Sequence, residues 1–291
     1  MSEQATPPMT AKHSNLTLRV LSALLLFPLL VWVTWAGDLP FALLLAAAAA
    51  VAALELTALF TPVRCPEIFG VVVAGLLPLA PWWAARFAAP VHASHVLIFL
   101  AVAAMALLVL NLFRPGPLEG APQRVAASAL AWVYCGGLIS AVSGVRIHFG
   151  FAWAMLAFVV SWMNDILAYF AGRFLGRTPF YPKVSPKKTW EGFAGGVLGS
   201  VAGALGTKAV FLYVPQPAGE VFQLSWAGCV GLGIGASVLG PLGDLAESML
   251  KRAAGVKDSG NLIPGHGGLL DRIDALLFVA PWIYLWATLV Q

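Results

Sequence analysis

Long apolar runs dominate the chain and recur along its whole length, separated by short polar segments. Each run is roughly 17 to 25 residues long, the length that a helix needs to cross a bilayer. The pattern predicts about nine membrane-spanning helices, over residues 20–36, 41–60, 69–85, 96–112, 125–145, 151–170, 193–214, 225–242 and 275–290. Because unpaired backbone cannot face hydrocarbon, we expect an all-α polytopic membrane protein.

The composition supports this class. Of the 291 residues, 60% are hydrophobic and 10% are charged, and the mean hydropathy is +0.85, which excludes an ordinary soluble domain. Three widely spaced cysteines without CxxC or histidine pairing suggest neither a disulfide framework nor a zinc site. Residues 1–15 are polar and contain prolines, so we expect a disordered arm before the first span.

The distribution of cations predicts the orientation of the spans. If the N-terminus is cytoplasmic, fourteen of the seventeen Lys and Arg residues fall in internal segments, which is a strong positive-inside bias. Only Arg86, Arg146 and Lys208 fall outside. This orientation places both strongly charged loops, 171–191 and 243–274, in the cytoplasm.

The loop 243–274 concentrates five carboxylates, four cations and a glycine-flanked histidine between two apolar runs. In a membrane protein such density is typical of a functional site. Hard oxygen donors, basic side chains and flexible glycines are the groups that hold a divalent cation against phosphates. If the start of this loop is helical, one face carries Asp244, Glu247, Ser248 and Lys251.

Asp271 and Asp274 are predicted to lie on the first turn of the last span. Compensation of the helix dipole explains Asp274 adequately and Asp271 less well. His266 stands in a run of proline and glycines that favours an irregular turn. It has three candidate roles, as a turn residue, as a donor to phosphate or as a metal ligand, of which ligation is least favoured because Mg²⁺ prefers oxygen.

The loop 171–191 follows a helical face that carries Asp165, Tyr169 and Arg173 at steps of four. Asp165 has two candidate roles, an ion pair with Arg173 or a direct contact with a metal or substrate. The segment SPKKT, residues 185–189, stands directly before a helix predicted to begin near Trp190. A helix N-terminus beside two lysines suits a phosphate, and anionic lipid headgroups are the alternative partner.

Residues 248–274, SMLKRAAGVKDSGNLIPGHGGLLDRID, closely resemble the signature of phosphatidate cytidylyltransferases, also called CDP-diglyceride synthases. Residues 164–165, 168–169, 172–173 and 185–192 also look like that family. The resemblance covers the C-terminal half with specific motifs, while the N-terminal half supports it only by being membranous. We therefore divide the chain into the arm, N-terminal transmembrane helices over 16–150 and a catalytic transmembrane domain over 151–291.

The resemblance implies transfer of a cytidylyl group from CTP to phosphatidic acid, with release of pyrophosphate, in phospholipid biosynthesis. It implies Mg²⁺, with room for a second cation. By analogy with the family, Asp244 and Asp271 are the expected metal ligands, and Asp165 and Asp274 are further candidates. Lys251 and Arg272 are the other expected catalytic residues. The expected substrate contacts are Ser185, Lys187, Lys188, Thr189, Arg252, Lys257, His266, Gly267 and Gly268.

We expect the site to open to the cytoplasm from a cell membrane, the bacterial inner membrane, with a lateral gap for lipid. No nucleic acid partner is expected, and a homodimer is left open. Two rival functions remain. A CTP-dependent lipid alcohol kinase would use similar chemistry but transfer the γ-phosphoryl group. A transporter is disfavoured because the charges cluster at the ends of spans and no internal repeat is visible.

Overall fold

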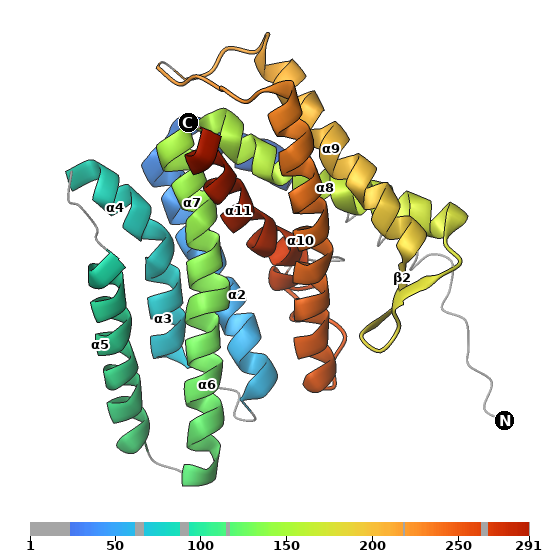
Figure 1. Ribbon diagram of the computed structural model, residues 1–291. Coiled ribbons are helices and arrows are strands. Elements are labelled where there is room, and N and C mark those ends of the chain that lie inside the picture. Colours follow the sequence, from blue (N-terminus) through green and yellow to red (C-terminus); the bar gives the residue numbers. More distant parts are fainter. Residues whose placement is uncertain are drawn as a thin grey trace, which may run out of the picture.

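The computed structural model describes residues 24–61, 67–87, 93–114, 117–217, 219–262 and 267–290. This part of the chain is almost entirely helical (Figure 1). Eight of its helical stretches are long and apolar enough to cross a membrane, and a shorter apolar helix, Leu24–Ala36, precedes them. The expected all-α polytopic class with about nine spans is thereby confirmed. The predicted disordered arm lies outside the described residues, and the cytoplasmic N-terminus and the domain boundaries stay predictions.

The N-terminal helices include two composite spans. Pro78 and Pro81 do not end the third span, because the chain passes through one 3₁₀ turn and continues as helix. A π-helical turn likewise joins the two parts of the span before residue 150. The elements are α2 (Asp38–Phe60), α3 (Ile68–Leu76), η1 (Leu77–Leu79), α4 (Ala80–Phe87), α5 (Ala93–Leu112), η2 (Leu118–Gly120), α6 (Ala121–Ala131), η3 (Trp132–Gly137) and α7 (Leu138–Phe149).

The C-terminal half contains four helices and a short hairpin, α8 (Phe151–Leu175), β1 (Pro179–Tyr181), β2 (Ser185–Thr189), α9 (Trp190–Phe211), α10 (Trp226–Ala253) and α11 (Leu270–Val290). The two strands pair antiparallel, with Pro179 opposite Thr189. The hairpin was not expected from the sequence. Helix α10 extends well past the predicted end of its span at residue 242, so Asp244 and Lys251 lie on helix, as their spacing suggested.

Small residues set the close approach of these helices. A Cβ atom on Gly195 of α9 would lie 2.7 Å from the carbonyl oxygen of Leu167 on α8, so only glycine allows this contact. Without a hydrophobic driving force between helices in lipid, such backbone approach is what stabilises their association. The result is a tightly packed pair, α8 and α9, that carries the hairpin at one end, where α8 ends and α9 begins (Figure 1).

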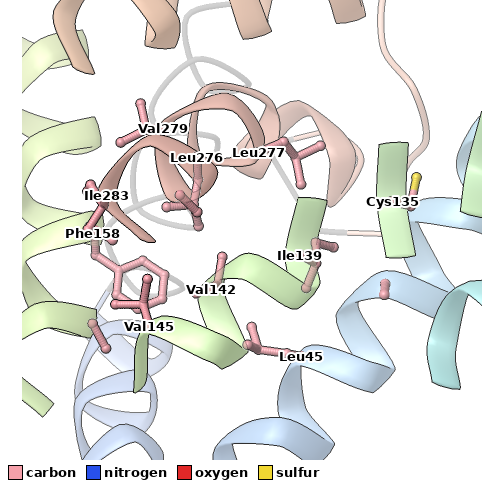
Figure 2. Packing of buried hydrophobic residues seen from close by; sticks show 14 of the residues in the cluster. Leu45, Cys135, Ile139, Val142, Val145, Phe158, Leu276, Leu277, Val279 and Ile283 are labelled. Carbon is pink, nitrogen blue, oxygen red and sulfur yellow. The ribbon is translucent and has the colours of Figure 1, made fainter. Parts of the chain in front are cut away.

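Two N-terminal helices, α2 and α7, pack against α11. Figure 2 shows Leu45 of α2 and Val142 of α7 in one apolar cluster with Phe158 of α8 and with Leu277 and Ile283 of α11. Leu277 and Ile283 are fully buried. The two halves of the sequence therefore share one core, which packs α11 against α2 and α7.

The two ends of the bundle carry different polar groups. At one end the buried Arg146 side chain forms ion pairs with Asp38 at 3.2 Å and Glu220 at 2.8 Å. The connection 212–225 lies at that end, and the hairpin and the segment after Ala253 lie toward the other (Figure 1). The two charged loops singled out in the sequence therefore share one side of the bundle.

This arrangement and the cation asymmetry predict the membrane topology. Reporter fusions after Lys188 and after Lys257 should both give a cytoplasmic signal, and fusions after Gln216 and Gln291 should give a far-side signal. Paired phosphatase and fluorescent-protein reporters in whole cells measure this. A far-side signal from either loop fusion would overturn the predicted orientation.

Candidate functional site

A cavity of about 460 Å³ lies between α8, the hairpin, the start of α9 and α10, and nine of its fifteen lining residues have polar or charged side chains. We call it the hairpin cavity. It brings together residues from both charged loops, which are far apart in the sequence. Of the side chains predicted as site residues, it is lined by Asp165, Ser185, Lys187, Lys188, Thr189 and Asp244.

Lys188 joins the hairpin to α10. Its ammonium group lies 2.8 Å from the Asp244 carboxylate and donates to the carbonyl oxygen of Pro241 at 3.1 Å. An ammonium group has three protons, so one remains for a ligand in the cavity. Both side chains of the pair are partly accessible. The pair therefore fixes the direction of the lysine without removing it from the cavity.

Helix α9 begins at Trp190, as predicted, with Thr189 as its N-cap. The Thr189 hydroxyl accepts a hydrogen bond of 3.1 Å from the backbone of Gly192. The Glu191 carboxylate accepts from the backbone N–H groups of Arg177 and Thr178, which ties the entry of the hairpin to the helix. Because Thr189 and Gly192 line the cavity, the positive end of the α9 dipole points to it.

The predicted face of α8 forms the opposite wall. Asp165, Tyr169 and Arg173 all line the cavity, and Arg173 donates to the Tyr169 hydroxyl at 3.2 Å. Among the described residues no ion pair joins Asp165 to Arg173, so the orienting role considered for Asp165 finds no contact to support it. The neighbouring Asn164 is buried, and its Oδ1 atom receives no hydrogen bond from the described residues.

A second, mainly apolar cavity of about 480 Å³ adjoins the first. Its walls come from the Leu24–Ala36 helix, α2, α7, α8 and α11. We call it the apolar cavity. Its polar lining consists mainly of Asp271, Arg272 and Asp274, and Asp165 lines both cavities. Asp165 therefore stands where a polar compartment meets an apolar one.

Three charged residues with largely buried side chains, Glu247, Lys251 and Asp271, form ion pairs next to this boundary. Lys251 is 8% exposed and is paired with Glu247 and, at 2.5 Å, with the Oδ1 atom of Asp271. The Oδ2 atom of Asp271 accepts from the backbone N–H groups of Ser259 and Gly268, and the Ser259 hydroxyl oxygen lies 3.0 Å from it. Lys251, an expected catalytic residue, and the N–H group of Gly268, an expected substrate contact, are thus both engaged with Asp271.

Close packing brings the carboxylates of α10 and α11 together. A Cβ atom on Gly243 would lie 2.5 Å from the carbonyl oxygen of Asp274, so only glycine permits this helix crossing. Asp274 consequently lies within electrostatic range of Asp244 and Asp165. Of these three carboxylates, Asp244 alone has an ion pair among the described residues, with Lys188. Negative charge therefore accumulates at the crossing.

The donor set at this crossing fits a hard divalent cation. In the described part of the chain no three His, Cys, Asp or Glu residues form a ready-made metal cluster. Mg²⁺ is commonly held by one or two carboxylates together with substrate phosphates and water, and so needs no such cluster. Asp244 and Asp165 supply ligands of this type in one cavity, which the unpaired Asn164 oxygen also lines. Asp271, the other expected ligand, lines the apolar cavity instead and already accepts from Lys251, Ser259 and Gly268.

The remaining predicted site residues are spread over the connection and the start of α11. Arg252 is exposed and donates to the carbonyl of Val256, and Lys257 is also exposed. Arg272 is exposed beside the apolar cavity. Gly267 adopts a positive φ of 84°, and His266 lies outside the described residues.

Sequence reasoning missed two supporting carboxylates. Glu247 was placed on the correct helical face but received no role, and it is fully buried against Lys251. Glu55 of α2 was missed entirely, although it contacts the connection between α10 and α11. A carboxylate inside an apolar run, here ALELTAL, is the signal that could have identified it.

Comparisons with known proteins agree with the resemblance of residues 248–274. The model of the Cytidylyltransferase family matches residues 17–290. The phosphatidate cytidylyltransferase of Brucella abortus biovar 1 (strain 9-941) is 35% identical over 283 residues, which cover 95% of this chain and 94% of that protein. The enzyme of the same name from Bacillus subtilis (strain 168) is 34% identical, over 91% of this chain and 95% of its own.

The similarity is greater over part of the chain. The phosphatidate cytidylyltransferase of Synechocystis sp. is 48% identical over 137 residues, which are 47% of this chain and 43% of that protein. The full-length matches extend the similarity through the N-terminal helices, which the signature alone did not reach. The chain therefore belongs to the cytidylyltransferase family and is a membrane-embedded nucleotidyltransferase.

Proposed function

We propose that the protein transfers the cytidylyl group of CTP to phosphatidic acid and produces CDP-diacylglycerol and pyrophosphate for phospholipid biosynthesis. The observation that carries this proposal is the meeting of a basic, polar cavity with an apolar one at Asp165. A water-soluble triphosphate and a lipid must meet in this reaction, and each cavity suits one of them. The names of the relatives support the same substrates.

CTP is proposed to occupy the hairpin cavity. Lys187 and Lys188 line it, and the N-terminus of α9 points to it with the Thr189 cap at its edge. Backbone N–H groups, a helix dipole and ammonium groups together form a site for anionic phosphates. Ser185 adds a hydroxyl to the same wall. This assigns the hairpin residues to the nucleotide, a division that the sequence left open.

Phosphatidic acid is proposed to place its acyl chains in the apolar cavity. Leucines from the Leu24–Ala36 helix and α2 line this cavity, and Trp162 and Phe158 of α8 complete it. Arg272 stands beside the cavity, where a guanidinium group can hold the lipid phosphate. The phosphate monoester would then lie beside Asp165, toward the nucleotide.

The reaction needs no general base from the protein. A phosphate monoester has a second pKa near 6, so it is largely a dianion at neutral pH and is already a nucleophile. Its oxygen forms a bond to the α-phosphorus of CTP while the bond from that phosphorus to the bridging oxygen of pyrophosphate breaks. The main obstacle is repulsion between the two anions, which basic side chains and correct placement reduce.

A divalent cation, Mg²⁺, is proposed to be held by Asp244 and Asp271, with Asp165 and Asp274 as further ligands. Bound there, it would supply charge neutralisation for the phosphates and the leaving group. Lys188 and Lys251 orient the two principal carboxylates through ion pairs of 2.8 and 2.5 Å. Arg252, Lys257, His266 and Gly267 remain proposed contacts at the cytoplasmic mouth, and the membrane is proposed to be the bacterial inner membrane.

Position-specific labelling tests the reaction. Purified protein in detergent is given CTP labelled with ³²P at either the α or the γ phosphorus, with and without Mg²⁺, and either phosphatidic acid or diacylglycerol, which presents a free hydroxyl group, as the acceptor. Label from the α position should enter the lipid phase only with Mg²⁺, and label from the γ position should leave as pyrophosphate. Lipid that acquires γ label instead would establish a CTP-dependent kinase and exclude the proposed transfer.

Substitution of the two principal aspartates tests the metal proposal. Asp244→Asn and Asp271→Asn preserve side-chain size but remove the negative charge that binds Mg²⁺, so either change should nearly abolish turnover. If both serve one unit, the double substitution should add little to either single loss. Initial rates across a Mg²⁺ titration in purified protein measure these effects.

Asp38→Asn is the matched control, because this carboxylate pairs with Arg146 at the opposite end of the bundle. It should retain turnover within about twofold, as expected for a change away from the reacting groups. Ordinary turnover by either site variant at unchanged Mg²⁺ demand, or fully multiplicative losses, would contradict a shared cation site and direct attention to Asp165 and Asp274.

A further inference from the structure

Glu55 of α2 is buried against the connection between α10 and α11, more than 200 positions away in the sequence. The residue is 9% exposed, and its carboxylate accepts three hydrogen bonds. The Oε1 atom accepts from the backbone of Leu269 at 2.9 Å, and Oε2 accepts from the backbone of Leu270 at 2.8 Å. Oε2 also accepts from the Ser259 hydroxyl at 3.1 Å.

Two of these donors belong to the start of α11. The first N–H groups of a helix have no partner within the helix, and a carboxylate there is also favoured by the helix dipole. Glu55 supplies this cap from another helix rather than from the residues next to α11. The position of the first turn of α11, which contains Asp271, therefore depends on α2.

The connection closes around the Glu55 carboxylate. A Cβ atom on Gly268 would lie 2.6 Å from Oε2, and one on Gly260 would lie 2.7 Å from Oε1. Glycine at both positions lets the backbone reach the carboxylate from two sides. A side chain of another size or charge at position 55 would consequently disturb residues 259–260 and 268–270 directly.

Ser259 links Glu55 to Asp271. Its hydroxyl oxygen lies 3.1 Å from Oε2 of Glu55 and 3.0 Å from Oδ2 of Asp271, and its backbone N–H donates to the same Oδ2 atom. The Oδ2 side of Asp271 is thus held by the connection, while its Oδ1 atom faces Lys251. Glu55 contacts both Ser259 and the start of α11, and so joins the two segments that hold Asp271.

We propose that Glu55 is a positioning residue, which holds the connection and the first turn of α11 so that Asp271 points correctly into the active site. Its kinetic consequence rests on the proposed function, whereas its structural consequence does not. The N-terminal half would thereby contribute to the site through one carboxylate. Glu55 itself touches no substrate in this proposal, because it lines neither cavity and its oxygens face protein donors.

Glu67 provides a matched control. It is similarly buried at 7% exposure, lies in the same half of the chain, and pairs with Arg114 and Arg124. None of its contacts among the described residues reaches the connection between α10 and α11. Glu67→Gln therefore removes a buried carboxylate charge without touching Asp271.

The kinetic test compares Glu55→Gln with Glu67→Gln in purified full-length protein. Gln keeps the size but presents an amide NH₂ to backbone donors, so Asp271 should lose its position. We expect kcat to fall about 10- to 100-fold, as small misplacements of catalytic groups do, with a change below about threefold in KM for CTP. Ser259→Ala should change kcat in the same direction by a smaller factor, and Glu67→Gln should leave both parameters near wild type.

Hydrogen exchange supplies a readout independent of activity. Peptides that span Leu269 and Leu270 should exchange faster in Glu55→Gln, because their amides lose an acceptor, while peptides from the hairpin 179–189 should not change. The proposal would be overturned if Glu55→Gln left exchange at the start of α11 unchanged, or if exchange there became faster while kcat stayed normal. The same effects in Glu67→Gln would also overturn it. If the wild-type protein moves no label but the exchange contrast holds, the proposed function fails and the structural link stands.

Discussion

The ion pair between Lys188 and Asp244 is the contact on which the geometry of the candidate site depends. It joins a hairpin of two short strands to a long membrane helix at 2.8 Å, and the Pro241 carbonyl reinforces it. A two-stranded hairpin alone is marginally stable in water, so its place over the cavity requires such anchors. The Thr189 cap and the Glu191 contacts hold the other end of the hairpin to α9. The shape of the cavity therefore depends on the ion pair between Lys188 of the first charged loop and Asp244 of the second.

A second lysine, Lys251, also pairs with a carboxylate that is a proposed metal ligand, at a more buried position. Lys251 lies between Glu247 and Asp271, and breaking such a buried pair leaves an uncompensated charge at a large cost in stability. Pairing lets the protein keep carboxylates at the ends of apolar helices, where an isolated charge is expensive. In both pairs a proposed metal ligand is oriented by a lysine. The charge needed for chemistry and the charge needed for folding are supplied by the same side chains.

Much of the fold could be predicted because the length of apolar runs directly reports membrane spans. A helix start near Trp190 and the place of Asp271 on the first turn of the last span were also predicted from local sequence, and α9 begins at Trp190 and α11 at Leu270. The hairpin could not be predicted, because Ser-Pro-Lys-Lys-Thr shows no alternation of apolar and polar residues. Nor could the contact of Glu55 with Leu269, because no local pattern reports a pairing across more than 200 positions.

The central claim is that the triphosphate of CTP binds in the hairpin cavity beside Lys188, and equilibrium binding of CTP tests it most directly. Lys188→Met keeps the stem of the side chain but removes its charge, and Lys183→Met makes the same change in the exposed turn of the same hairpin, at a residue that does not line the cavity. By calorimetry in Mg²⁺, the account predicts a Kd for CTP raised about 10- to 100-fold by Lys188→Met, the loss of one charge-assisted contact, and changed less than about twofold by Lys183→Met. Equal CTP affinity in the two variants would contradict it.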